Sequence, residues 1–219
     1  MAAVLFREWE TTVFRYQCNG VIISNRHVLT TATCTGDSSR GDIKVRVGST
    51  FPYKRGRIHA LDVVRKHFKF SHNLDADIAV LTLSEPLELS YQVAVVNIPE
   101  QDAIIKTQNG VLDKAIITNI TYYTDEELKR CSTNSMELET TVGCNKYLRT
   151  ELSFKDLVTE NMLCLYLIYF GDCSSFDSLG APLVINGTVY GIYSWGRWGD
   201  SSFKVFTRVS AFSEWIKNF

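Results

Sequence analysis

Short apolar runs separated by turn residues dominate this chain, a pattern typical of antiparallel β structure. In the first part of the chain they predict strands over residues 18–23, 26–31, 43–47, 57–64 and 78–83. A connecting region between Pro86 and Pro99 follows. A second set of strands is then expected over residues 114–120, 136–142, 162–166, 182–185, 188–194 and 204–209. Two such groups indicate two packed antiparallel β-barrels.

The firmest local signal is the pair Asn186 and Gly187, which separates two of these strands. Both residue types readily adopt the left-handed backbone conformation that a two-residue type I′ turn requires. The pair therefore predicts a tight β-hairpin.

Two helices are expected. The last has Phe212, Trp215, Ile216 and Phe219 at i, i+3, i+4 and i+7, the spacing of one apolar helix face. The other spans either about 144–152 or the stretch 154–158 just after it. We therefore expect a single all-β domain, with one barrel over about 1–98, a second over about 99–209 and a helix over about 210–219.

Composition narrows the function classes. A chain of 219 residues with 45% hydrophobic residues can bury one large core or two small ones. A formal net charge of -1 gives no reason to expect a nucleic-acid partner, and no apolar run reaches the ~18–20 residues of a membrane helix. No motif points to a cofactor or a metal ion, so we expect neither.

The six cysteines indicate disulfides, because no two are close enough for a zinc or redox motif. Glycosylation sequons at Asn119 and Asn186 agree with an exported protein. The first residues, from Met1 to Arg7, do not form a signal peptide. We expect secretion, with the leader outside this chain.

Three segments carry a family resemblance: LTTATC at residues 29–34, DIAVL at 77–81 and FDSLGAPL at 176–183. In this order and spacing they resemble the chymotrypsin/trypsin family of secreted serine proteases (peptidase S1). The resemblance covers nearly the whole chain. It implies two packed six-stranded antiparallel barrels and a C-terminal helix.

The resemblance also implies a degraded catalytic triad. Active members carry their histidine base immediately before the second cysteine, where this chain has Thr33, while Asp77 matches the family aspartate. In the family the serine directly follows an aspartate, so the Asp177-Ser178 pair identifies Ser178 as the serine. The family serine also stands three residues before a proline, and counting back from Pro182 instead reaches Leu179. Without a base the hydroxyl of a serine is a poor nucleophile.

The oxyanion-binding glycine of the family is replaced by Phe176. We therefore expect a protease homologue that does not hydrolyse peptides. The alternative is an active endopeptidase with a rearranged base, for which His72, five residues before Asp77, is the candidate. The other histidines, His27, His59 and His67, are expected to be structural.

The family's substrate pocket is altered as well. Gly171 stands where trypsin-like members place an aspartate, whereas Ser194, Trp195 and Gly196 match the strand that binds the substrate backbone. Lys204 replaces a small residue, and either fills the pocket or lies in a solvent-facing loop. The resemblance further implies two disulfides, Cys18–Cys34 and Cys144–Cys164, and leaves Cys131 and Cys173 either bridged to each other or free.

Basic residues gather in one segment of the chain. Within 26 residues, opposed mainly by Asp62, the sequence has Lys44, Arg46, Lys54, Arg55, Arg57, Arg65, Lys66 and Lys69. Strand alternation could bring several of them to one face that binds an anionic partner, or they form an ordinary solvated surface. The function expected is a monomeric, non-catalytic protein that binds a protein or peptide partner.

Overall fold

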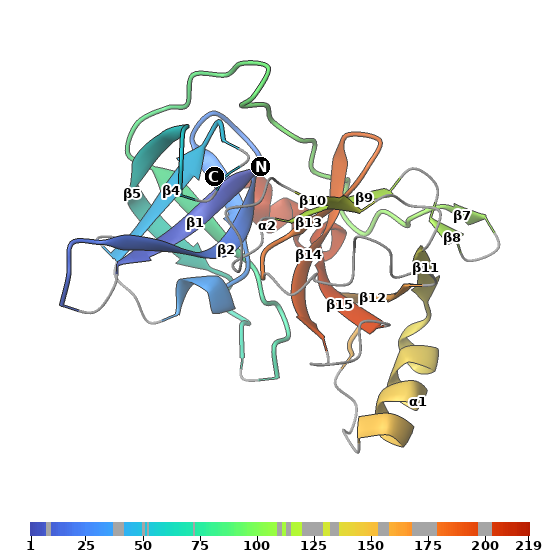
Figure 1. Ribbon diagram of the computed structural model, residues 1–219. Coiled ribbons are helices and arrows are strands. Elements are labelled where there is room, and N and C mark those ends of the chain that lie inside the picture. Colours follow the sequence, from blue (N-terminus) through green and yellow to red (C-terminus); the bar gives the residue numbers. More distant parts are fainter. Residues whose placement is uncertain are drawn as a thin grey trace.

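The structure is a computed structural model that describes most of the chain (Figure 1). The described residues are 1–7, 10–36, 42–49, 51, 53–71, 73–108, 111–112, 115–119, 129–131, 136–152, 158–167, 179–196 and 203–219. Only the backbone is described at residues 108, 118–119, 129–131, 151–152 and 167. Within these residues, no helix combines the length and the apolar character that a bilayer crossing requires.

Six antiparallel strands close into the first barrel, in the order β1-β2-β3-β6-β5-β4. Their bounds are β1 Ala2–Arg7, β2 Phe14–Ile22, β3 His27–Thr30, β4 Ile43–Val47, β5 Arg57–Lys66 and β6 Ala79–Leu83. In β4, alternate residues Ile43, Val45 and Val47 are buried in the barrel core, so that Lys44 and Arg46 face outward. The alternation seen in the sequence is thus the in-out pattern of a closed sheet.

The second half forms one antiparallel sheet in the order β10-β9-β13-β14-β15-β12-β11-β8-β7. Six strands are longer: β9 Ala115–Asn119, β11 Met136–Glu139, β12 Met162–Leu167, β13 Pro182–Ile185, β14 Thr188–Gly196 and β15 Phe203–Arg208. Three are of two or three residues: β7 Thr107–Gln108, β8 Val111–Leu112 and β10 Lys129–Cys131. The all-β, two-barrel prediction is confirmed.

The predicted hairpin is present between β13 and β14. Ile185 pairs with Thr188, and the two turn residues have φ of 48° at Asn186 and 75° at Gly187. Both values lie in the left-handed region, as a type I′ turn requires.

Of the two positions that the sequence leaves open for the first helix, the structure has the earlier one. The first helix, α1, covers Thr141–Leu152, whereas most of the stretch 154–158 lies outside the described residues. The strand predicted over 136–142 ends earlier, at Glu139, because the Thr140 hydroxyl accepts the Gly143 N–H at 3.0 Å and so caps the helix.

The C-terminal helix α2, Ser213–Lys217, follows a 3-10 turn η4 over Val209–Phe212. Phe212 and Ile216 are buried, and Trp215 and Phe219 pack against the same cluster. That cluster contains residues of both halves, among them Val21, Leu29, Ile78, Val80, Val189 and Ile192. The apolar helix face predicted from the sequence therefore joins the two halves.

Two disulfides predicted by the resemblance are present. Cys18–Cys34 joins β2 to the 3-10 turn η1, Thr33–Thr35, and Cys144–Cys164 joins α1 to β12. Each bridge lies within one half of the chain. Cys173 and the side chain of Cys131 lie outside what the structure describes.

Replacing Cys18 and Cys34 together by alanine is expected to lower the free energy of unfolding by about 3 kcal/mol. The bridge spans 16 residues, and its loss restores conformational freedom to the unfolded chain. Urea unfolding of the oxidised proteins measures the loss. The Cys144/Cys164 pair, with a separation of 20, is the matched comparison and should lose a similar amount. A loss well under 1 kcal/mol in either variant would contradict the entropic explanation.

Candidate functional site

Asp77 is the centre of the candidate site. It lies two residues before β6 and is fully buried. Carboxylate Oδ1 accepts the backbone N–H of Thr33 at 2.7 Å, and Oδ2 accepts the hydroxyl of Ser194 at 2.5 Å. The hydroxyl of Thr33 and the backbone N–H of Ala32 also hydrogen-bond to this carboxylate. Its acceptor positions are thus used by hydroxyl and amide donors.

Burial raises the pKa of Asp77 above its ordinary value, because the charged form loses its hydration. Hydrogen bonds from Ser194 and from Thr33 favour the charged form and offset part of this rise. The carboxyl group is therefore a desolvated acid stabilised by local donors.

Local sequence explains how Thr33 reaches this position. The turn η1 is held by the Thr31 hydroxyl, which accepts the Cys34 N–H at 3.2 Å, and by the Thr35 hydroxyl, which donates to the Ala32 carbonyl at 2.7 Å. The side chain of Thr33 is exposed. A threonine hydroxyl does not accept a proton near neutral pH, so this position offers no general base.

Histidine does not take part in this cluster among the described residues. The partners of the Asp77 carboxylate are Thr33, Ala32 and Ser194. Burial is the main cause that lowers the pKa of each of the three described histidines, which are His27, His59 and His67. The candidate rearranged base, His72, lies outside the described residues.

Ser194 has a role that sequence reasoning missed. The resemblance placed it on the substrate-binding strand, whereas its hydroxyl in the structure is the donor to Asp77. From the same half, the Thr207 hydroxyl donates to the Asp77 main-chain carbonyl at 2.7 Å. The sequence signal that could have revealed this role is Asp77 itself, because a buried carboxylate requires hydrogen-bond donors from neighbouring residues. These bonds link the first barrel to the second sheet.

The segment 179–182 lies between the two halves. The Asn19 N–H donates to the Leu179 carbonyl at 2.7 Å, and the Gly180 N–H donates to the Tyr193 carbonyl at 2.8 Å. The side chain of Leu179 packs against the core clusters of both halves. The residue selected by counting back from Pro182 is thus an apolar side chain at the junction.

Four of the remaining site residues lie outside the described part of the chain: Gly171, Cys173, Phe176 and Ser178. Their predicted roles in the pocket, the oxyanion position and the triad stay predictions. Asn186 is exposed in its turn, and only the backbone is described for Asn119 in β9.

Lys204 is buried, with 2% of its surface exposed. Its strand β15 pairs with β14 on one side and with β12 on the other, opposite Gly196 and Leu165. The ammonium nitrogen lies 5.5 Å from the centre of the Tyr193 ring. The solvent-facing alternative is therefore wrong, and the side chain occupies interior space beside Gly196.

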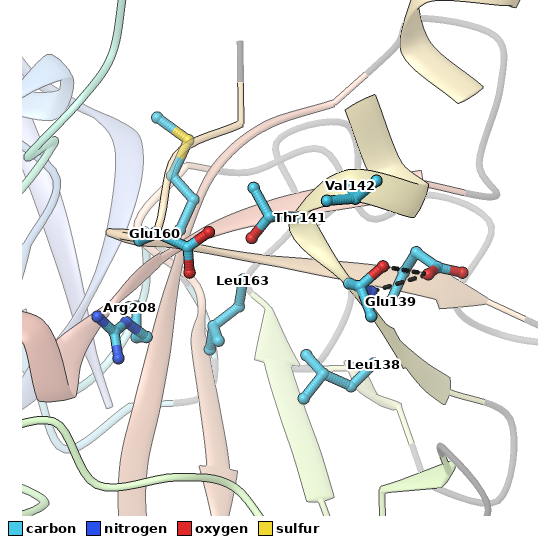
Figure 2. Close-up of a pocket in the computed structure, with 9 residues that line it drawn as sticks. Leu138, Glu139, Thr141, Val142, Glu160, Leu163 and Arg208 are labelled. Carbon is cyan, nitrogen blue, oxygen red and sulfur yellow. Dashed lines mark hydrogen bonds between the residues drawn. The ribbon is translucent and has the colours of Figure 1, made fainter. Parts of the chain in front are cut away.

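A separate cavity of about 360 Å³ lies where β11 leads into α1 (Figure 2). Its apolar lining is supplied by Leu138, Val142, Met162 and Leu163. Charged residues of both signs, Glu139, Glu160 and Arg208, stand around it (Figure 2). This mixture selects no ligand class. In the described part of the chain, no cluster of three or more metal-ligating side chains is present.

Comparison with known proteins agrees with this architecture. The family model for trypsin matches residues 1–216. A trypsin of Phaedon cochleariae is 32% identical over 206 residues, covering 91% of this chain and 77% of that protein. Alkaline trypsin B of Manduca sexta is 31% identical over 229 residues, covering 100% and 84%.

Solved structures share the fold. The scabies mite inactivated protease paralogue S-I1 superposes with a TM-score of 0.77 at 22% identity, covering 100% of this chain and 93% of that chain. Paralogue S-D1 has the same TM-score at 16% identity, with coverages of 99% and 90%. Given the match across residues 1–216 and relatives above 30% identity, this chain belongs to the trypsin family.

Proposed function

We propose that this chain is a secreted trypsin-family protein that does not hydrolyse peptide bonds and acts by binding a protein partner. The observation that carries the proposal is the environment of Asp77. Thr33 and Ser194 supply hydrogen bonds to the carboxylate, and no histidine is among its described partners. Removing the base of a serine protease costs about a millionfold in rate.

Two further features support the proposal. Leu179 places an apolar side chain at the junction between the halves, and Lys204 fills interior space beside Gly196. Neither side chain supplies a nucleophile, and a lysine side chain beside Gly196 agrees with an altered substrate pocket. The two described disulfides, together with the family, support an extracellular location.

A fluorophosphonate probe tests the proposal directly, because it labels only an activated serine. We expect no labelling of this chain under conditions in which an active trypsin is labelled completely. Stoichiometric labelling that disappears in Ser178→Ala would reject the proposal. Peptide hydrolysis lost in Ser178→Ala and weakened in His72→Ala would instead establish the alternative, an endopeptidase with a rearranged base.

A further inference from the structure

The connection between β5 and β6 begins with a histidine that is enclosed by aromatic rings. His67 is buried, with 7% of its surface exposed. The centre of its ring lies 4.6 Å from that of Phe68, 4.9 Å from that of Phe212 and 5.0 Å from that of Trp215. Since Phe212 belongs to η4 and Trp215 to α2, this one imidazole joins the connection to the C-terminal end of the chain.

Hydrogen bonds of His67 also hold the backbone of residues 67–71. Its Nδ1 accepts the Lys69 N–H at 3.3 Å, its carbonyl accepts the Phe70 N–H at 3.0 Å, and its own N–H donates to the Ile78 carbonyl at 3.0 Å. Because Nδ1 is an acceptor, the neutral ring carries its proton on Nε2. A proton added to Nδ1 would remove the acceptor of the Lys69 N–H and set two donors against each other.

The same connection has a second anchor further along the chain. Asp75 Oδ1 accepts the Thr159 hydroxyl at 2.9 Å and the Asn161 side-chain amide at 3.1 Å, both from the second half. Leu74 and Ala76, on either side of it, have φ of 61° and 53°. This left-handed conformation costs about 1–2 kcal/mol for each residue with a Cβ. The connection is therefore kept in place by its contacts rather than by backbone preference.

Protonation of the enclosed ring is unfavourable. Burial is the largest cause, Lys69 acts in the same direction, and Asp75 acts in the opposite one, so that the pKa of His67 is lowered from its ordinary value of 6.5. The stabilisation by the neutral ring is complete above about pH 6.5 and is lost as the pH falls through the lower pKa of the folded state.

The other charged residues on the elements packed around His67 are Arg65 and Lys66 on β5, Glu214 and Lys217 on α2, and Asp77 before β6. Arg65 lies over the Phe219 ring, Lys66 donates to the Gly36 carbonyl, and Lys217 pairs with Glu100. Glu214 is exposed, and the Asp77 carboxylate accepts the donors described above. Among the described acids, Asp75 is thus the one that acts on the ring.

We propose that His67 is an acid-sensitive anchor of residues 67–71. In its neutral form it holds these residues against η4 and α2. Once protonated, the ring leaves its aromatic enclosure, residues 67–71 move away, and Trp215 becomes more accessible to solvent. Acidic surroundings thereby expose an aromatic surface that is covered at neutral pH. Neither form of the anchor requires the chain to cleave peptides or to lack that activity.

Hydrogen exchange followed by NMR tests the anchor at individual amides. After correction for the intrinsic pH dependence of exchange, protection of the Lys69 and Phe70 amides should fall about fivefold or more between about pH 7 and about pH 5. The Val189 amide, which donates to the Asn97 carbonyl at 3.0 Å, should keep its protection. An unchanged protection of Lys69 and Phe70, or an equal fall at all three amides, would overturn the proposal.

His67→Asn removes the titrating group and keeps an oxygen that can accept the Lys69 N–H. Protection of the Lys69 and Phe70 amides should then be the same at both pH values. His27→Asn is the matched control, because burial also lowers the pKa of His27 and its Nδ1 bonds to the Ser24 hydroxyl at 2.8 Å. It should keep the pH dependence of the unmodified protein.

A pH dependence that survives in His67→Asn, or that disappears in His27→Asn, would contradict the role of His67. Both variants retain Asp77, so the comparison also separates His67 from that buried acid. Thermal unfolding checks that the variants are folded, and the exchange data on the unmodified protein decide the matter if His67→Asn is not.

Exposure of Trp215 is measured by acrylamide quenching, as the difference in fluorescence between the protein and Trp215→Phe. Quenching of this difference should increase on acidification, over the same pH range in which the Lys69 and Phe70 amides lose protection. Constant quenching of Trp215 over that range would reject the proposed exposure of the aromatic surface.

Discussion

Gly180→Ala is expected to destabilise the protein by roughly 3–5 kcal/mol, the sum of backbone strain and overpacking. Gly180 has φ of 78°, and a Cβ there would lie 2.0 Å from the Asn19 carbonyl oxygen and 2.8 Å from the Thr30 hydroxyl. The contacted carbonyl is backbone, and it already accepts the Thr30 hydroxyl at 2.7 Å. Neither the backbone at Asn19 nor the backbone at Gly180 can shift without disrupting the junction between the halves. Urea unfolding measures the loss.

Gly187→Ala is the matched control for this prediction. Gly187 has nearly the same φ, 75°, but nothing lies within 4 Å of the position its Cβ would occupy. Only the conformational cost applies, about 1 kcal/mol. The excess of Gly180→Ala over this control isolates the steric clash at the junction. Equal losses in the two variants would show that the junction accommodates a side chain.

Asp77→Ala should cost about 3 kcal/mol or more, because it removes the acceptor of one buried and one partly buried hydrogen bond. The Thr33 N–H and the Ser194 hydroxyl would both lose their acceptor, and each unsatisfied buried donor costs about 1–3 kcal/mol. Asp77→Asn keeps the shape and one acceptor oxygen, so its loss should be clearly smaller. Similar losses for the two variants would mean that packing, not hydrogen bonding, holds this residue.

The unmodified protein and Asp77→Asn should also differ in how their free energy of unfolding depends on pH. Burial raises the pKa of Asp77 in the folded state, so the folded chain holds this proton more tightly than the unfolded chain. From about pH 3.9, where the unfolded carboxyl ionises, up to the raised folded pKa, this group's contribution to stability falls as pH rises. The Asp77→Asn variant has no carboxyl group at this position, so its stability should not show this decline. Unfolding curves of both proteins across the acidic range check it; parallel curves would contradict it.

Much of the fold was predictable from local pattern. Strand β4 begins and ends as the alternation of residues 43–47 predicts, and the Asn186-Gly187 turn has the required φ values. Strand β1 was missed because Ala2, Ala3, Val4 and Leu5 are all buried and therefore show no alternation. A strand covered on both faces cannot be told from other apolar runs by its period.

The site was predictable only in part. The resemblance brought Thr33 beside Asp77, and the structure places them in contact. The side on which Lys204 lies could not be read from the strand pattern. The β14–β15 pairing shifts register between Tyr193 and Trp195, and such a shift changes which face each following residue occupies.

The hydrogen bonds of Asp77 have a consequence for how this chain can diverge. Neither described disulfide ties one half of the protein to the other, and the aspartate takes donors from both, Thr33 from the first and Ser194 from the second. Loss of this acid would therefore weaken the attachment of one half to the other, whether or not the protein cleaves a substrate. The presence of Asp77 is explained by its structural hydrogen bonds alone, so it is not by itself evidence of proteolysis.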